Sequence, residues 1–189
     1  MKLILASRSP DRKKALDILG LEYDVIPSQF DEKSIRDEDP YVLNRKLSEA
    51  KAREVAKKVS DAIIVSGDLF VVFDNKIYEK PRDNAEAKEM LKSFSGNTVD
   101  ILASVSVYNT SEDTMRSVVD KNSVTFRHLR ESEIDDYINR YPVTDFAAGF
   151  DSDGVLRFTE RFQGKYPLII SAIPMNELIT FLRENGLDV

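Results

Sequence analysis

Asp68 is the residue whose type and setting point most directly to chemistry. It follows Gly67 and stands between two apolar runs, residues 62–65 and 69–73, at the expected end of a buried strand. Burying an unpaired carboxylate is costly, so Asp68 needs a hydrogen-bonded partner, a cation or a metal. Two interpretations stay open from the spacing: a general base or metal ligand, or an aspartate that merely forms a turn.

The segment from Ser7 to Arg12 predicts a seat for phosphate. Ser9 can cap a helix whose first residue is Pro10, which leaves free backbone N–H groups and the positive end of the helix dipole at the loop. Hydroxyl and guanidinium groups beside such a helix end suit an anion. The alternative is a capped helix with solvated arginines. The segment is neither a glycine-rich P-loop nor a dinucleotide fingerprint.

Further charged residues fall at positions that could complete such a site. Asp31 and Glu32 form a carboxylate pair near an expected strand end, able to hold a hard cation such as Mg²⁺, although such pairs are usually just solvated. Lys51 lies on the border of the apolar face of an expected helix, where a lysine either snorkels or meets an anion. Lys80 precedes Pro81, which favours an extended backbone and could aim its ammonium group into a cleft.

Composition excludes several kinds of chemistry. The 189 residues contain no cysteine and one histidine, which rules out a disulfide framework or thiolate metal site and makes a histidine-rich zinc site or a Ser-His triad improbable. His128 stands beside arginines and is expected on the surface without a role. The net charge of −6 argues against nucleic acid as a partner. The short apolar run after Met1 fits neither a signal peptide nor a membrane span, so a cytoplasmic protein is expected.

Hydrophobic periodicity predicts alternating strands and helices in one domain over residues 1–189. The fold class is α/β, a mixed twisted sheet flanked by helices. Asp39-Pro40 should open a long helix that ends near Ser60, with an inward stripe of Leu43, Leu47, Ala50 and Val55. Strands are expected at 2–6, 62–65, 69–73, 76–78, 98–108 and 117–127, with a turn at 74–75 and a loop at 109–116. The other helices are expected at 10–19, 84–94, 131–140 and 174–185.

Taken together, the motifs resemble the Maf family of nucleotide pyrophosphatases. The motifs, in chain order, are Leu5-Ala6-Ser7-x-Ser9-Pro10-x-Arg12, Asp31-Glu32, Lys51-Ala52, Gly67-Asp68, Lys80-Pro81, Phe94-Ser95-Gly96, Val124-x-Phe126, Glu133-Ile134-x-x-Tyr137 and Ala147-Ala148-Gly149-Phe150. They span nearly the whole chain. The resemblance implies two lobes around a cleft, a fold related to the inosine triphosphate pyrophosphatases, and a homodimer. It also implies hydrolysis of a nucleoside triphosphate between its α- and β-phosphates with a divalent metal, Mg²⁺ or Mn²⁺.

Carried over residue by residue, the resemblance implies roles for the residues singled out above. Asp68 would be the proton acceptor and a metal ligand, and Glu32 a second metal carboxylate. The phosphate clamp would comprise Ser7, Ser9, Arg12, Lys51 and Lys80. This division of roles is coherent, because attack of water on phosphorus needs charge neutralisation and a base more than a covalent intermediate.

Three positions depart from the family pattern. Asp11 stands where arginine is usual, Leu69 where threonine or glutamine is usual, and Asp153 where glutamine is usual. The last two bear on base choice, so substrate preference stays open between the thymidine/uridine and methylated guanosine branches. Asp11 is expected to point toward solvent. The alternative function is a catalytically weak nucleotide-binding regulatory protein linked to cell division.

Overall fold

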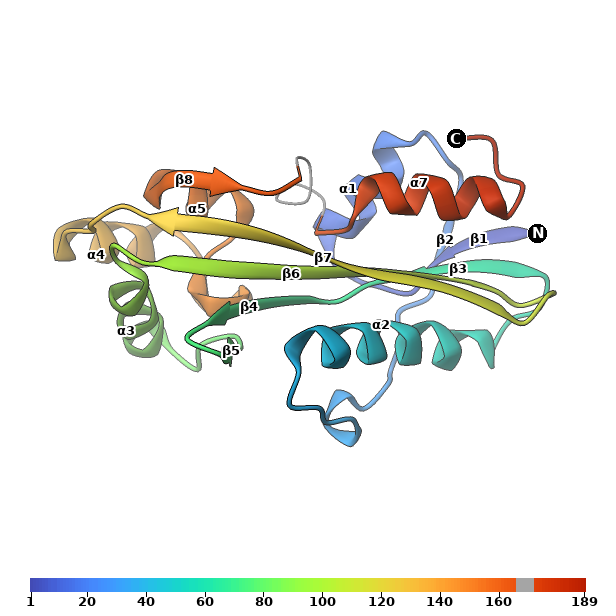
Figure 1. The fold of residues 1–189 in the computed structure, drawn as a ribbon, viewed down its shortest axis with the longest axis horizontal. Coiled ribbons are helices and arrows are strands. Elements are labelled where there is room, and N and C mark those ends of the chain that lie inside the picture. Colours follow the sequence, from blue (N-terminus) through green and yellow to red (C-terminus); the bar gives the residue numbers. More distant parts are fainter. Residues whose placement is uncertain (166–171) are drawn as a thin grey trace. The chain divides into compact units, whose positions relative to one another are not determined.

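The computed structural model describes residues 1–165 and 172–189. Figure 1 shows how its helices and strands follow one another along the chain. The strands are β1 (Lys2–Leu5), β2 (Asp24–Val25), β3 (Ala62–Ser66), β4 (Leu69–Phe73), β5 (Lys76–Tyr78), β6 (Thr98–Asn109), β7 (Thr114–Phe126) and β8 (Thr159–Gln163). The helices are α1 (Pro10–Ile18), α2 (Pro40–Ala56), α3 (Asn84–Phe94), α4 (Glu131–Arg140), α5 (Ser152–Phe158) and α7 (Met175–Glu184), with 3-10 turns η1 (Glu32–Ser34), η2 (Val143–Asp145) and η3 (Ala147–Gly149).

The chain forms two compact units. Unit 1 comprises Met1–Leu69, Ala103–Asp120 and the described residues from 172 to Val189, and unit 2 comprises Phe70–Leu102 and Lys121–Lys165. The eight strands are hydrogen-bonded in the order β2-β1-β3-β6-β4-β5, with β7 paired to β6 and β8. Parallel pairs of β1 with β2 and β3, and antiparallel pairs such as β3 with β6, confirm the predicted mixed sheet flanked by helices.

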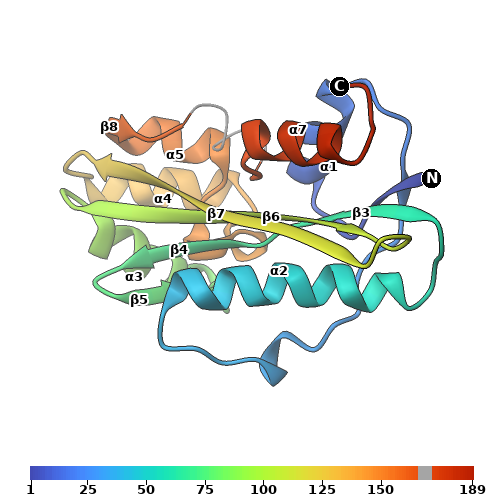
Figure 2. The ribbon, with the colours of Figure 1, turned by 45° about the vertical axis from the view of Figure 1, so that its right-hand side comes forward.

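Alternation along the strands gives unit 1 a core on each face of its sheet. One face carries Leu3, Leu5, Ile63, Val65, Val105 and Val107, which pack against residues of α1 and α7. The opposite face carries Ile4, Ala6, Ala62 and Ile64, which pack against Ala52 and Val55 of α2. Figures 1 and 2 show α1 and α7 over one face and α2 over the other. Because side chains alternate with period two, even-numbered residues of β3 face α2.

Unit 2 is built around an aromatic cluster. Phe94, at the end of α3, lies with its ring centroid 4.9–6.1 Å from those of Phe73, Tyr78, Phe126 and Phe150. Asp74 and Asn75 both adopt positive φ, 50° and 57°, between β4 and β5, as a tight two-residue hairpin turn requires. The predicted hairpin is confirmed.

Helix boundaries follow the predicted caps. The Ser9 side chain accepts a hydrogen bond from the Arg12 amide, Pro10 begins α1, and Gly20 adopts φ +67° just after the helix. Asp39 caps α2 in the same way, with Pro40 as its first residue. These signals act within one turn of the chain, which is why the sequence alone reveals them.

The predicted inward stripe of α2 was partly wrong. Leu47 and Val55 are buried, but Leu43 and Ala50 are only half-buried, and the remaining buried positions are Asn44, Ser48 and Ala52. Ser48 faces inward because its partners are polar: its Oγ lies 2.6 Å from Ser106 Oγ, and Ser66 Oγ donates to its carbonyl. The pattern of apolar residues along α2 could not predict a buried face whose contacts are made by serines.

Several short elements had no counterpart in the sequence prediction. These are β2, the three 3-10 turns, α5 and β8. The loop expected at 109–116 is also shorter, since β6 continues to Asn109 and β7 begins at Thr114. Within the described residues, no helix combines the length and apolar character needed to cross a membrane.

Candidate active site

Asp68 lies at the break between β3 and β4, in the part of the chain that belongs to unit 1. It is buried, with 8% of its surface exposed. Its Oδ1 accepts a hydrogen bond of 2.9 Å from the Leu69 amide. Continuing the alternation of Ile64 and Ser66, its side chain is expected on the face that α2 covers, and it contacts a residue of that helix.

That residue is Lys51, which joins two of the predicted carboxylates. Its Nζ lies 3.1 Å from Asp68 Oδ2 and 2.9 Å from Glu32 Oε1. The Lys51 side chain is 13% exposed, so the lysine meets anions and does not extend into solvent, which decides between the two interpretations of this position. One ammonium group therefore holds both carboxylates together.

The structure separates the carboxylate pair Asp31-Glu32. Asp31 caps the short turn η1, its Oδ1 accepting a hydrogen bond of 3.0 Å from the Lys33 amide. Glu32 does not cap the turn, and its side chain pairs with Lys51. Asp31 precedes η1 and Glu32 begins it, after a loop that follows the end of β2 at Val25, so the expectation that they stand near a strand end was wrong.

The residues predicted to bind phosphate come together in the loop before α1. The Ser9 amide donates to Ser7 Oγ at 3.1 Å, and Arg12 Nη1 donates to the same oxygen at 3.2 Å. Ser7 is buried, whereas Arg8 is exposed. Ser7, Ser9 and Arg12 therefore converge at the N-terminus of α1, where backbone N–H groups and the helix dipole favour an anion.

The hydrogen-bond donors of the Arg12 guanidinium are only partly satisfied by the described residues. Burial lowers the pKa of its guanidinium, while the charges of Asp68, Asp11 and Glu32 act to raise it. Its Nε is buried and has no hydrogen-bond partner among the described residues. Because arginine stays protonated in proteins, a bound anion would supply the interaction that this guanidinium lacks.

Gly67, which the sequence indicated only as part of a motif, stands where no side chain fits. A Cβ built there would lie 2.6 Å from the Ser104 carbonyl oxygen and 3.3 Å from Arg12 Nε. Any side chain would therefore separate the arginine from the strand break that carries Asp68. Ser104 was missed altogether; the one available signal was a pair of serines, Ser104 and Ser106, within an apolar run.

Four further positions were singled out from the sequence. Lys80 belongs to unit 2, is exposed, and makes no ion pair with another described residue, so its place in the clamp stays a prediction. Asp11 is half-buried, and its charge acts to raise the pKa of Arg12; its expected orientation toward solvent stays a prediction. Leu69 is half-buried. The side chain of Asp153 lies outside the described part.

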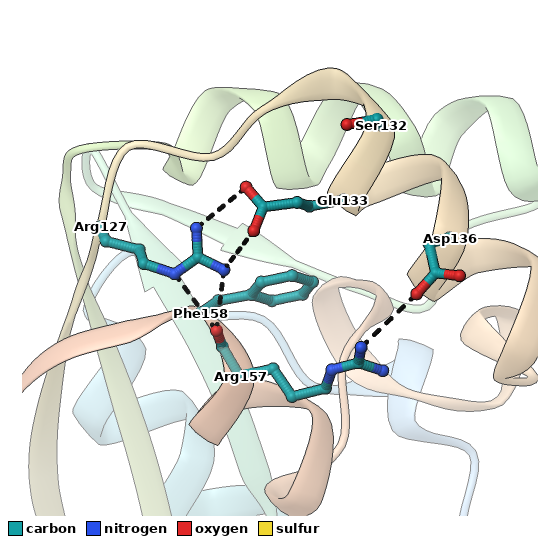
Figure 3. Close-up of a pocket in the computed structure, with 6 residues that line it drawn as sticks. All are labelled: Arg127, Ser132, Glu133, Asp136, Arg157 and Phe158. Atoms are coloured by element: carbon teal, nitrogen blue, oxygen red, sulfur yellow. Dashed lines mark hydrogen bonds and ion pairs between the residues drawn. The ribbon is translucent and has the colours of Figure 1, made fainter.

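Unit 2 contains a pocket of about 260 Å³ lined by Arg127, Ser132, Glu133, Asp136, Arg157 and Phe158 (Figure 3). Its charges satisfy one another. Arg127 forms a two-pronged pair with Glu133 at 2.9 and 3.0 Å and also donates to the Arg157 carbonyl. Asp136 pairs with Arg157 at 3.5 Å. Figure 3 shows these groups paired with one another across the pocket wall, which ties α4 to the segment that follows β7 and to α5.

Glu32 and Asp68 fit a divalent cation of the Mg²⁺ type. They already share one positive charge, and both offer hard oxygen ligands. No group of three or more His, Cys, Asp or Glu side chains suited to a metal occurs within residues 1–165 and 172–189. Two carboxylates with phosphate oxygens completing the shell are the usual arrangement for Mg²⁺ bound with a nucleotide.

Fold and site together define a class: an α/β protein that pairs two carboxylates and a lysine with an arginine at a helix N-terminus, a donor set suited to a phosphorylated ligand. The chain belongs to the Maf-like protein family, whose model matches residues 2–185.

Two relatives are similar over almost their whole length. A dTTP/UTP pyrophosphatase from Syntrophus aciditrophicus (strain SB) is 33% identical over 186 residues, which cover 98% of this chain and 90% of that protein. A 7-methyl-GTP pyrophosphatase from Idiomarina loihiensis (strain ATCC BAA-735 / DSM 15497 / L2-TR) is 35% identical over 191 residues, which cover 100% of this chain and 96% of that protein.

Proposed function

We propose that this protein is a nucleoside triphosphate pyrophosphatase, a hydrolase that converts a nucleoside triphosphate and water to the monophosphate and pyrophosphate with a divalent cation. The observation that carries the proposal is the joining of Asp68, Lys51 and Glu32 by ion pairs in the same unit as the buried Arg12 guanidinium. Family membership and the names of both relatives support the same reaction class.

The residues of unit 1 divide the work between binding and proton transfer. Arg12, Ser7, Ser9 and the first N–H groups of α1 bind phosphate oxygens, a charge-assisted arrangement that favours the anion. Asp68 orients the attacking water and accepts its proton, which a carboxylate can do only once it faces the substrate. Glu32 and Asp68 would hold Mg²⁺ or Mn²⁺, which supplies neutralisation of phosphate charge when bound.

Lys51 and Lys80 complete the proposed clamp. Lys51 pairs with both carboxylates, and its ammonium group would also bind a phosphate oxygen of the triphosphate. Lys80 joins the clamp on the strength of the resemblance. The exposed ammonium of Lys80 makes no ion pair within the described part of the chain, so no protein partner must be displaced.

The resemblance also supports a homodimer, whereas the cytoplasmic location and the single domain over residues 1–189 rest on the sequence pattern. The charge of −6 supports a small nucleotide as partner in preference to a nucleic acid. The two relatives are named for different bases, so the proposal commits to the triphosphate and leaves the base to experiment.

A substrate panel tests the proposal. Purified protein is incubated with the canonical triphosphates, dTTP and 7-methyl-GTP, with Mg²⁺ or Mn²⁺, and products are identified by ion-exchange chromatography and ³¹P NMR. Equal amounts of monophosphate and pyrophosphate are expected, and reaction in ¹⁸O-water shows which phosphorus is attacked. Release of orthophosphate and a diphosphate would contradict the proposal, and tight binding without product would establish the regulatory alternative.

A further inference from the structure

The β3–β6 ladder is interrupted at the residue that carries the chemistry. Ser66 pairs with Ser106 in the antiparallel register, so Asp68 stands opposite Ser104. Residues opposite each other in a hydrogen-bonded antiparallel pair normally exchange both N–H···O=C bonds. Here the Ser104 amide donates to the Asp68 carbonyl at 2.9 Å, but the Asp68 amide donates to the Ser104 hydroxyl at 3.0 Å. A side chain has replaced one main-chain acceptor.

The Ser104 hydroxyl is fixed from both sides. Ser104 is fully buried, and its Oγ also donates to the Asn44 carbonyl on α2 at 3.4 Å. Its own carbonyl lies where a Cβ on Gly67 would approach to 2.6 Å. The serine therefore connects the main chain of Asp68 to the helix that carries Lys51, beside a glycine that leaves no room for a side chain.

We propose that Ser104 is a positioning residue for Asp68, an inference that rests on the proposed function for its turnover readout. By accepting the Asp68 N–H, the hydroxyl diverts the chain from the regular ladder and directs the carboxylate to Lys51. Without it, the buried amide either loses its partner, which is costly, or returns to the Ser104 carbonyl. Both changes move the carboxylate, and a displacement of about 1 Å in a reacting group costs on the order of a hundredfold in rate.

The chain offers a closely matched control in Ser106. It is also fully buried on β6, two residues along and on the same face, but its hydroxyl bonds to Ser48. We expect Ser104→Ala to lower kcat by about ten- to a hundredfold while KM changes less than about threefold. Ser104→Thr, which keeps the hydroxyl, should restore most of kcat. Ser106→Ala should melt at a lower temperature and keep kcat within about twofold of wild type.

Amide exchange of Asp68 tests the inference without turnover. Ser104→Ala should accelerate hydrogen exchange of the Asp68 amide, measured by NMR, by at least about tenfold, and Ser106→Ala should not. If Ser104→Ala fails to fold, Ser104→Cys, with its weaker acceptor, takes its place and should give smaller changes in the same direction. Equal losses of kcat in Ser104→Ala and Ser106→Ala, or unchanged exchange at Asp68, would overturn the proposal. A wild-type protein that hydrolyses no triphosphate would refute the proposed function, and exchange at Asp68 would still decide the role of Ser104.

Discussion

Replacing Lys51 with methionine removes the positive charge that Asp68 and Glu32 share while keeping most of the side-chain volume. The two ion pairs differ in burial: the Lys51 and Asp68 side chains are 13% and 12% exposed, whereas Glu32 is 56% exposed. Breaking a buried pair costs about 3–5 kcal/mol, and an exposed pair contributes about 0–1 kcal/mol. Asp68 is not completely dry, so a loss of about 3 kcal/mol is expected in metal-free buffer.

That loss has a measurable thermal equivalent. For a chain of this size, 1 kcal/mol corresponds to about 2–4 °C in the melting midpoint, so Lys51→Met should melt about 6–12 °C below wild type in EDTA. The uncovered carboxylates should then bind Mn²⁺ more tightly than in wild type, where Lys51 competes for them. At a free Mn²⁺ concentration of about a hundred times Kd, binding restores about 2.7 kcal/mol. Differential scanning calorimetry across a Mn²⁺ series measures both effects.

Lys88 provides the matched control. It too bridges two carboxylates, Glu131 at 2.9 Å and Asp135 at 2.6 Å, but both of these are exposed, 63% and 47%. Lys88→Met should therefore shift the midpoint by less than about 4 °C and gain nothing from Mn²⁺. If Lys51→Met melts like wild type, or if Mn²⁺ stabilises it no more than wild type, Lys51 does not act as counter-ion to the metal carboxylates.

Three further predictions each concern one residue. Asp68→Asn should reduce turnover by at least about a hundredfold in a protein that melts normally, as loss of a general base does; near-normal steady-state turnover would remove Asp68 from the mechanism. Lys80→Ala should weaken triphosphate binding more than monophosphate binding in calorimetric titrations, and equal losses would exclude Lys80 from the clamp. Hydrogen bonds from Arg127 and Arg130 hold the pKa of Glu133 well below its ordinary 4.5, so its contribution to stability is present above that pH and is lost as the pH falls below it. The melting midpoint of wild type should accordingly fall more steeply below pH 4.5 than that of Glu133→Gln, and parallel pH curves would contradict this.

The sequence was sufficient wherever a structure depends on neighbours in the chain. The Ser9 and Asp39 caps marked the starts of α1 and α2, and Gly20 marked the end of α1. Asp68 stood out because an isolated carboxylate between apolar runs needs a partner whatever the fold. Such features depend only on a residue's type and its immediate neighbours, so the amino-acid sequence alone is enough to predict them.

Tertiary structure decided which residues meet. Lys51 contacts Asp68 because α2 lies against the even-numbered face of β3. Ser48 of α2 faces inward because its partners there, Ser66 and Ser106, are polar. Ser104 reaches Asp68 across 36 positions of sequence through strand register. Asp31 and Glu32 are adjacent in sequence, yet a 3-10 turn assigns one to capping and the other to Lys51. The periodicity of apolar residues predicts which face of a helix or strand packs against other apolar side chains. The pairing of polar side chains depends instead on strand register and on the orientation of a helix about its axis, and both are fixed only when the elements pack together.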